Sequence, residues 1–352
     1  MVVLSGMVDD LLLAQLVDGK IAAIARAVSV VENGRTGFEE LLAAIHPRLG
    51  RARRIGITGP PGAGKSTLTE RLVAAFRASG LRVAVVAVDP TSPFTGGALL
   101  GDRIRMEQIA LDPGVYIRSM ATRGSLGGLA TSTREVCDLL DAAGFDRILV
   151  ETVGVGQSEL DVARMADTTI LVLVPESGDG IQALKSGVME VADCFLVNKA
   201  DRPGADRVAR EVELALDLRM GVAHRNVPAH HGALTRKAPN AVAPDAPEPD
   251  QWRAPVLLGA AARGEGIEEL LGVLDRHWDW MVANGELDRR RRQRLAQRTR
   301  EVVDRATRRW VWQESHAEAV ITARLDEVSA GQLSPYELAA DIVATLKEGA
   351  RV

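Results

Sequence analysis

Short apolar runs rich in β-branched residues alternate with longer amphipathic segments through the middle of the chain. Runs that are apolar at nearly every position are typical of strands covered on both faces of a sheet, and the segments between them have the length and periodicity of helices. The alternation predicts an α/β fold with a doubly wound, mostly parallel sheet, whose ligand loops lie at the carboxyl ends of the strands. The predicted strands are 54–58, 83–88, 148–150, 169–174, 194–197 and 256–258, and the predicted helices are 66–79, 133–143, 181–190 and 206–219.

Other patterns flank this central region. A helical lead-in covers 9–49, and the chain after about Ile267 is helical, with breaks near Asn284-Gly285 and at 331–335. Its charged, long side chains favour helix but offer little core. We therefore expect an N-terminal helical extension (1–50), an α/β domain (51–275) with an irregular insertion rich in Pro, Ala and Asn (221–255), and a C-terminal helical arm (276–352).

Composition and charge exclude several classes of function. The chain has 352 residues, a net charge of −4 and a pI near 6.0, which gives no electrostatic reason to expect nucleic-acid binding. No apolar run approaches the length of a membrane span, and Asp9-Asp10 stand where a signal peptide would be positively charged. We expect a cytoplasmic protein with neither nucleic acid nor a membrane as partner. Cys137 and Cys194, one in a predicted helix and one in a predicted strand, offer no disulfide framework and no metal clip.

A phosphate-binding loop is predicted directly after the first strand. The sequence 59–66 has the form G-x-x-x-x-G-K-S between a predicted strand and a predicted helix. Its glycines allow backbone N–H groups to point at phosphate oxygens, Lys65 adds a cation on the β/γ side, and the Ser66 hydroxyl can ligate Mg²⁺. The N-terminus of the following helix also favours an anion. The residues predicted to hold the phosphates are Gly59, Pro60, Pro61, Gly62, Ala63, Gly64, Lys65, Ser66 and Thr67.

The tetrapeptide 198–201, N-K-A-D, favours guanine as the base. The Asp201 carboxylate can accept two hydrogen bonds from the N1–H and N2–H₂ edge of guanine, which adenine cannot offer, while Asn198 can reach N7 and the Lys199 stem can cover the ring. Such a site penalises an analogue that leaves its polar groups unpaired by roughly 10⁴-fold. Taken alone, Asp201 could equally cap a helix. The residues predicted to contact the base are Asn198, Lys199, Asp201, Gly259, Ala260 and Ala261.

Acidic residues at strand ends complete the predicted site. Glu151 ends the strand at 148–150 and begins a Glu-Thr-Val-Gly sequence, where P-loop NTPases hold an acid for Mg²⁺ and a glycine N–H, here that of Gly154, for the γ-phosphate. Asp89 follows another strand, and Asp102 lies in a glycine-rich loop. Acids at turns are usually caps, but three such acids opposite the phosphate loop indicate one shared cation. The predicted metal ligands are Ser66, Asp89, Asp102 and Glu151.

Four segments carry a resemblance to a known family. The sequence closely resembles the MeaB/ArgK family, whose members are G-protein chaperones of adenosylcobalamin-dependent acyl-CoA mutases, over about 41–271. The resemblance implies a P-loop NTPase fold of the SIMIBI type, GTP/GDP and Mg²⁺ as ligands, methylmalonyl-CoA mutase as the favoured partner, and a homodimer held by the C-terminal arm. The matching segments are VDPTSPFTGG (88–97), LGDR (100–103), TRGSLGG (122–128) and ETVGVGQSE (151–159).

The resemblance also implies three nucleotide-responsive loops: one through Asp89 and Asp102, one at 151–159, and one at 175–187. The third contains Gln182 and Lys185, to which the resemblance assigns the transmission of the nucleotide state to the mutase and a part in stimulated hydrolysis. Without the resemblance, these two residues would be interpreted as solvent-facing polar positions on a helix.

One prediction about rate comes from the residues themselves. Efficient small G proteins place a water-orienting Gln directly after the switch glycine, whereas this chain has Val155 there and its first Gln at 157. A valine side chain cannot orient water, so we predict slow intrinsic hydrolysis that a partner accelerates. The residues predicted to act in catalysis are Lys65, Asp102, Glu151, Gly154, Gln182 and Lys185, with Arg103 and Arg105 as further cations.

Two other functions fit parts of the sequence. A nickel-type metallochaperone GTPase would share the phosphate loop, but His224, His230 and His231 lie in the irregular insertion without matched cysteines. An ATP-dependent kinase of amino-acid transport proteins is disfavoured by the guanine-type sequence at 198–201. The isobutyryl-CoA, ethylmalonyl-CoA and hydroxyisobutyryl-CoA mutases remain open as partners, because substrate choice lies in the mutase.

Overall fold

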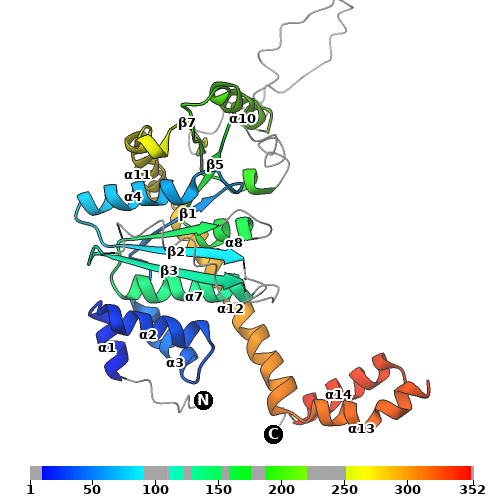
Figure 1. Ribbon diagram of the computed structural model, residues 1–352. Coiled ribbons are helices and arrows are strands. Elements are labelled where there is room, and N and C mark those ends of the chain that lie inside the picture. The colour runs from blue at the N-terminus through cyan, green and yellow to red at the C-terminus, as the bar shows by residue number, and fades with distance from the viewer. Residues whose placement is uncertain are drawn as a thin grey trace, which may run out of the picture. The chain divides into compact units, whose positions relative to one another are not determined.

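The strands form a seven-stranded parallel sheet. The computed structural model describes residues 10–90, 109, 111–122, 128–152, 158–175, 187–219 and 251–349, and within them the strand order is β3-β2-β4-β1-β5-β6-β7 (Figure 1). Because β1 lies between β4 and β5, the chain winds to both sides of it, which confirms the predicted doubly wound α/β fold. The strands are β1 Arg53–Thr58, β2 Val83–Pro90, β3 Val115–Thr122, β4 Arg147–Thr152, β5 Thr168–Leu173, β6 Cys194–Val197 and β7 Val256–Leu258.

Helices cover both faces of the sheet, as the apolar strands require. On one face, Val83 and Val85 of β2 belong to the core formed with α4 (Lys65–Ala78) and α11 (Ile267–Ala283). On the other, Ala84 and Val86 belong to the core formed with α7 (Gly128–Ala142) and α8 (Ser158–Met165), and α10 (Ala205–Arg219) packs on β5 and β6 (Figure 1). Of the predicted helix 181–190, the described part is the 3₁₀ helix Gly187–Glu190.

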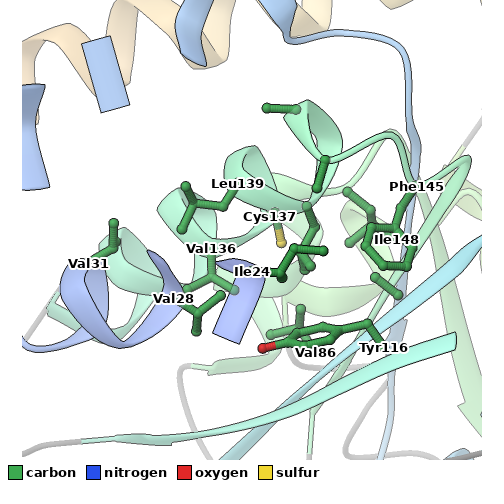
Figure 2. Close-up of a cluster of buried hydrophobic side chains, with 14 of the residues drawn as sticks. Ile24, Val28, Val31, Val86, Tyr116, Val136, Cys137, Leu139, Phe145 and Ile148 are labelled. Carbon is green, nitrogen blue, oxygen red and sulfur yellow. The ribbon is translucent and has the colours of Figure 1, made fainter. Parts of the chain in front are cut away.

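The N-terminal helices share the core of the sheet domain. They are α1 (Asp10–Val17), α2 (Ile21–Glu32) and α3 (Phe38–Ile45), followed by the 3₁₀ helix His46–Arg48. Ile24 and Val28 of α2 pack with Val136 and Leu139 of α7 (Figure 2). The lead-in therefore forms a further layer over α7, on the side away from the sheet.

The chain divides into two compact units, 1–288 and 289–352. The second contains most of α12 (Glu286–Arg309), a π-helical turn (Trp310–Glu314), α13 (Ala317–Ser329) and α14 (Pro335–Gly349). Its core is small and centres on Ala317, Leu338 and Ile342. The helical pattern predicted no break near residue 315, but Ser315 is extended there and ends the π-helical turn. Within the described ranges, no helix is long and apolar enough to cross a membrane.

Candidate functional site

The phosphate loop lies at the carboxyl end of the central strand, between the end of β1 at Thr58 and the start of α4 at Lys65. Gly59 and Gly64 have φ angles of 139° and 87°, in the region that favours glycine. A Cβ on Gly59 would lie 2.1 Å from the Val172 carbonyl oxygen, and one on Gly64 would lie 2.4 Å from Asn198 Nδ2. The loop therefore needs glycine at both positions, because other residues would be strained and would collide with β5 or with the Asn198 side chain.

Lys65 closes this loop on itself. Its Nζ donates hydrogen bonds to the carbonyl oxygens of Gly59, at 2.8 Å, and Pro60, at 2.9 Å, and the residue is only 5% exposed. A buried ammonium group needs such partners, since burying an unpaired charge is costly. The loop's own carbonyl groups therefore hold the ammonium group that is predicted to face the β and γ phosphates.

Ser66 and Glu151, both predicted metal ligands, lie together. Glu151 is in β4, in register with Ile57 of β1, and is 5% exposed. Ser66 Oγ donates to Glu151 Oε1 at 2.6 Å, and Thr69 Oγ1 lies 2.8 Å from Glu151 Oε2. Each carboxylate oxygen therefore has a hydroxyl partner. Thr69 lies one helical turn after Lys65, and sequence reasoning did not identify it.

This donor set fits Mg²⁺, which prefers hard oxygen ligands and few protein groups. The described residues contain no group of three or more His, Cys, Asp or Glu side chains that could hold a metal. The fit therefore depends on Ser66 and Glu151 together with phosphate oxygens. The Asp89 side chain and the whole of Asp102 lie outside the described residues, as do Gly154, Gln182 and Lys185.

Asn198 links the phosphate loop to the segment after β7. Its Nδ2 donates to the Ala63 carbonyl at 2.8 Å, and its Oδ1 accepts from the Ala261 N–H at 2.9 Å. The predicted contact with guanine N7 would fall to the second N–H of the amide, because one N–H already bonds to Ala63. Asn198 is buried, so a structural role accompanies the predicted binding role.

A turn follows Asn198 and presents Asp201. Lys199 has a φ of 59°, a left-handed conformation that no other non-glycine residue adopts in the described part of the chain. The Arg202 N–H donates to the Lys199 carbonyl, which closes the turn. Asp201 Oδ2 lies 3.1 Å from Arg263 Nη2, and the Asp201 side chain is about a quarter exposed, at 27%. The carboxylate predicted to recognise guanine is therefore accessible and has a cation beside it.

The segment 259–261 is held by the protein itself. The N–H groups of Gly259, Ala260 and Ala261 donate to Val197 O, Glu265 O and Asn198 Oδ1 respectively. These bonds hold the segment against the end of β6, Asn198 and Glu265, while its contact with the base stays a prediction.

Arg71 of α4 also holds this region. Its Nε and Nη2 donate to the Ala261 and Ala262 carbonyls at 3.0 and 2.8 Å. Sequence reasoning did not identify Arg71, since its acceptors are backbone carbonyls 190 and 191 residues away, which leave no sequence signal. Partial burial raises the pKa of the neighbouring Glu70, and the Arg71 charge opposes that rise.

Comparisons with known proteins identify a family and several relatives of this chain. Residues 24–316 match the family model described as methylmalonyl Co-A mutase-associated GTPase MeaB. A GTPase relative from Pyrococcus abyssi (strain GE5 / Orsay) is 45% identical over 302 residues, covering 84% of each chain. The Mus musculus methylmalonic aciduria type A homolog, mitochondrial, is 36% identical over 299 residues, covering 80% of this chain and 66% of that protein. The crystal structure of an LAO/AO transport system kinase is similar with a TM-score of 0.63 and 28% identity, covering 97% of this chain and all of the other.

Proposed function

The chain belongs to the MeaB family of GTPases, and from this premise we propose that it gates the delivery of adenosylcobalamin to an acyl-CoA mutase and protects that mutase. Methylmalonyl-CoA mutase is the favoured partner, because the family model carries its name and the mouse relative is named after methylmalonic aciduria. GTP and GDP are the proposed ligands, with Mg²⁺. The cytoplasmic location stays a prediction.

One observation carries the proposal: the Ser66–Glu151 hydrogen bond lies at the carboxyl ends of the strands, where Asn198 joins the phosphate loop to the segment proposed to contact the base. The groups proposed to bind phosphate, metal and base thus follow the carboxyl ends of β1, β4, β6 and β7, which lie on the same side of the sheet, as expected for nucleotides on parallel sheets.

The chain's own residues have distinct proposed tasks. The loop N–H groups and Lys65 bind the phosphates, and Asp201 reads the guanine edge. Glu151 orients the Ser66 hydroxyl by accepting its hydrogen bond, which leaves the Oγ lone pairs for a cation. When bound, Mg²⁺ neutralises charge on the β and γ phosphates. The loops that contain Asp102, Gly154, Gln182 and Lys185 would report the nucleotide state to the mutase.

A second copy of the chain is the proposed partner of the C-terminal unit. Leu295, Val303, Trp312, Leu325 and Val343 are each between 46% and 55% exposed. This unit has a core of only three buried apolar residues among those described, and small cores contribute little stability alone. Burial of these side chains against another copy would supply the missing apolar contact. Sedimentation of the full chain tests this point, and a monomer at all micromolar concentrations contradicts it.

Turnover with and without a mutase tests the main proposal. We expect the purified full chain to hydrolyse GTP slowly with Mg²⁺ and at least tenfold faster when methylmalonyl-CoA mutase is added, because Val155 cannot orient water. ATP should compete poorly, which separates this function from the kinase alternative. Fast unassisted turnover, or no response to any acyl-CoA mutase, would contradict the proposal. A Lys65→Ala chain controls for contaminating hydrolases.

A further inference from the structure

Arg71 joins the helix that follows the phosphate loop to the loop that follows β7. Its guanidinium donates two hydrogen bonds in a fork to successive carbonyls, those of Ala261 and Ala262. A guanidinium suits such a fork because its N–H groups are coplanar and diverge at fixed angles, whereas a lysine ammonium is a point charge. Arg71 therefore fixes both the position and the orientation of this short segment.

The segment is a 3₁₀ helix, Ala261–Arg263, that is held from both sides. Arg71 holds the Ala261 carbonyl, and Asn198 Oδ1 holds the Ala261 N–H. Since Asn198 Nδ2 donates to Ala63 of the phosphate loop, the contacts form a closed circuit from the loop through α4 and the 3₁₀ helix back to the loop. Removal of Arg71 opens this circuit without changing any of the residues predicted to contact phosphate or base.

The last residue of the same 3₁₀ helix reaches the predicted base-reading carboxylate. Arg263 Nη2 lies 3.1 Å from Asp201 Oδ2. A shift of the 3₁₀ helix would therefore move the Arg263 guanidinium. Because this group pairs with Asp201, its movement would also turn the carboxylate and change the direction in which it accepts hydrogen bonds. Arg71, the 3₁₀ helix and Asp201 therefore form a line of contact from α4 to the carboxylate predicted to read the base.

We propose that Arg71 is a positioning residue for guanine recognition, acting through the 3₁₀ helix and Arg263 on Asp201. The inference rests on the proposed function, because it requires a guanine nucleotide as the ligand. It assigns Arg71 to discrimination between bases and not to phosphate binding. The substitution of Arg71 should consequently weaken the ligands that use Asp201 most.

GDP and inosine diphosphate separate these effects. Inosine diphosphate keeps the phosphates, the ribose, O6 and N1–H but lacks the 2-amino group, so the ratio of the two dissociation constants reports one hydrogen bond to Asp201. We expect the full chain to prefer GDP, and Arg71→Ala to reduce that preference by about tenfold, roughly the value of one hydrogen bond to a charged group. Arg71→Lys should give an intermediate ratio, since it keeps the charge without the fork, and it provides the measurement if the alanine variant does not fold.

Arg77 provides the matched control on the same helix. It forms a comparable pair of contacts, to Asp112 Oδ2 at 2.9 Å and to the Leu81 carbonyl at 2.7 Å, far from the base segment. Arg77→Ala should lower the melting temperature and leave the GDP preference unchanged. Equal weakening of both nucleotides by Arg71→Ala would overturn the proposal, as would equal binding of both by the unmodified chain. If the unmodified chain binds no guanine nucleotide at all, the proposed function fails as well, which distinguishes the two results.

Discussion

Ser66 Oγ donates a hydrogen bond of 2.6 Å to Glu151 Oε1, and this contact joins the phosphate loop to the neighbouring strand β4. The carboxylate is buried, and its second oxygen lies within 2.8 Å of the Thr69 hydroxyl. A buried carboxylate with a hydroxyl at each oxygen is held in one orientation. That orientation in turn fixes the Ser66 hydroxyl, whose lone pairs are the expected Mg²⁺ donors.

Glu151→Gln should therefore impair the response to Mg²⁺ more than the binding of nucleotide. The amide has nearly the same shape but lacks the charge, and one of its ends donates where the carboxylate accepts. We expect GTP turnover at limiting Mg²⁺ to fall by about 10- to 100-fold, the usual cost of losing an orienting contact to a metal ligand. The affinity for GDP without Mg²⁺ should change less than twofold. Measurement of turnover against Mg²⁺ concentration checks this, with Ser66→Thr as the variant that keeps a hydroxyl. Unchanged Mg²⁺ dependence in Glu151→Gln would refute the orienting role.

Asp201→Asn should exchange the base preference from guanine to xanthine. The carboxylate can only accept, which suits the two N–H donors of guanine, whereas an amide accepts from N1–H and donates to the C2 carbonyl of xanthine. We expect the affinity for GDP to fall by roughly 10³- to 10⁴-fold, because polar groups are left unpaired, and xanthosine diphosphate to become the better ligand. Competition binding with both nucleotides measures the exchange. If the variant binds GDP as well as the unmodified chain does, Asp201 does not read the base.

The central part of the fold and its phosphate loop could be predicted because local sequence determines them. β1, β4, β5 and β6 are covered on both faces, so their apolar runs are unmistakable, and the glycines of the loop are required at fixed offsets by φ angles that L-residues avoid. The sequence does not predict β3, because this strand lacks such an apolar run. It is an edge strand whose residues alternate, and its Arg118 forms an ion pair with Glu32 of α2, so its pattern lacks a continuous apolar run.

The contacts that brace the site could not be predicted, because they join side chains to distant backbone. Nothing in the sequence around Arg71 indicates that its acceptors are the carbonyls of 261 and 262. The link that Asn198 forms between Ala63 and Ala261 could not be predicted either, because the predicted contact with the base already explains an asparagine at this position. Tertiary hydrogen bonds of this kind depend on the finished topology.

Asp141→Ala should destabilise the first unit without changing nucleotide affinity. The Asp141 carboxylate, 1% exposed, accepts hydrogen bonds from the N–H groups of Gly50, Arg51 and Ala52 and lies 3.4 Å from Arg54 Nη2. Its loss removes three hydrogen bonds to a charged acceptor, each worth roughly 1.5 kcal/mol, so we expect the free energy of unfolding to fall by about 3–5 kcal/mol. Arg54 keeps the Asp138 carboxylate, at 2.7 Å, as its partner. Urea unfolding measures this.

Asp275→Ala is the matched control for Asp141→Ala. Asp275 also pairs with an arginine, Arg53, at 2.8 Å, but its side chain is 67% exposed. Exposed pairs contribute about 0–1 kcal/mol, so this variant should be nearly as stable as the unmodified chain. Equal effects of the two substitutions would contradict the anchoring role of Asp141 at the junction between the N-terminal helices and β1.

Cys137 should make the first unit less stable in alkaline solution. The thiol is completely buried among the apolar side chains of α7 and the N-terminal helices (Figure 2), and this burial raises its pKa from 9.0 to about 11, with the Arg54 charge opposing the rise. The folded protein therefore keeps the proton in a range where the unfolded chain loses it. The stabilising contribution is complete below pH 9 and is lost as the pH rises towards 11.

Cys137→Ala isolates this contribution, because burial also raises the pKa of Cys194 and other groups titrate at alkaline pH. Between pH 9 and pH 11, the free energy of unfolding of the unmodified chain should fall by about 2 kcal/mol more than that of the variant, because the slope reaches about 1.4 kcal/mol for each pH unit only midway between the two pKa values. The variant also loses packing, but that cost does not depend on pH. Only the difference in slope between the two curves therefore reports the thiol. Parallel curves would mean that the Cys137 thiol ionises as readily in the folded protein as in the unfolded chain. That outcome would contradict the rise in its pKa that complete burial causes.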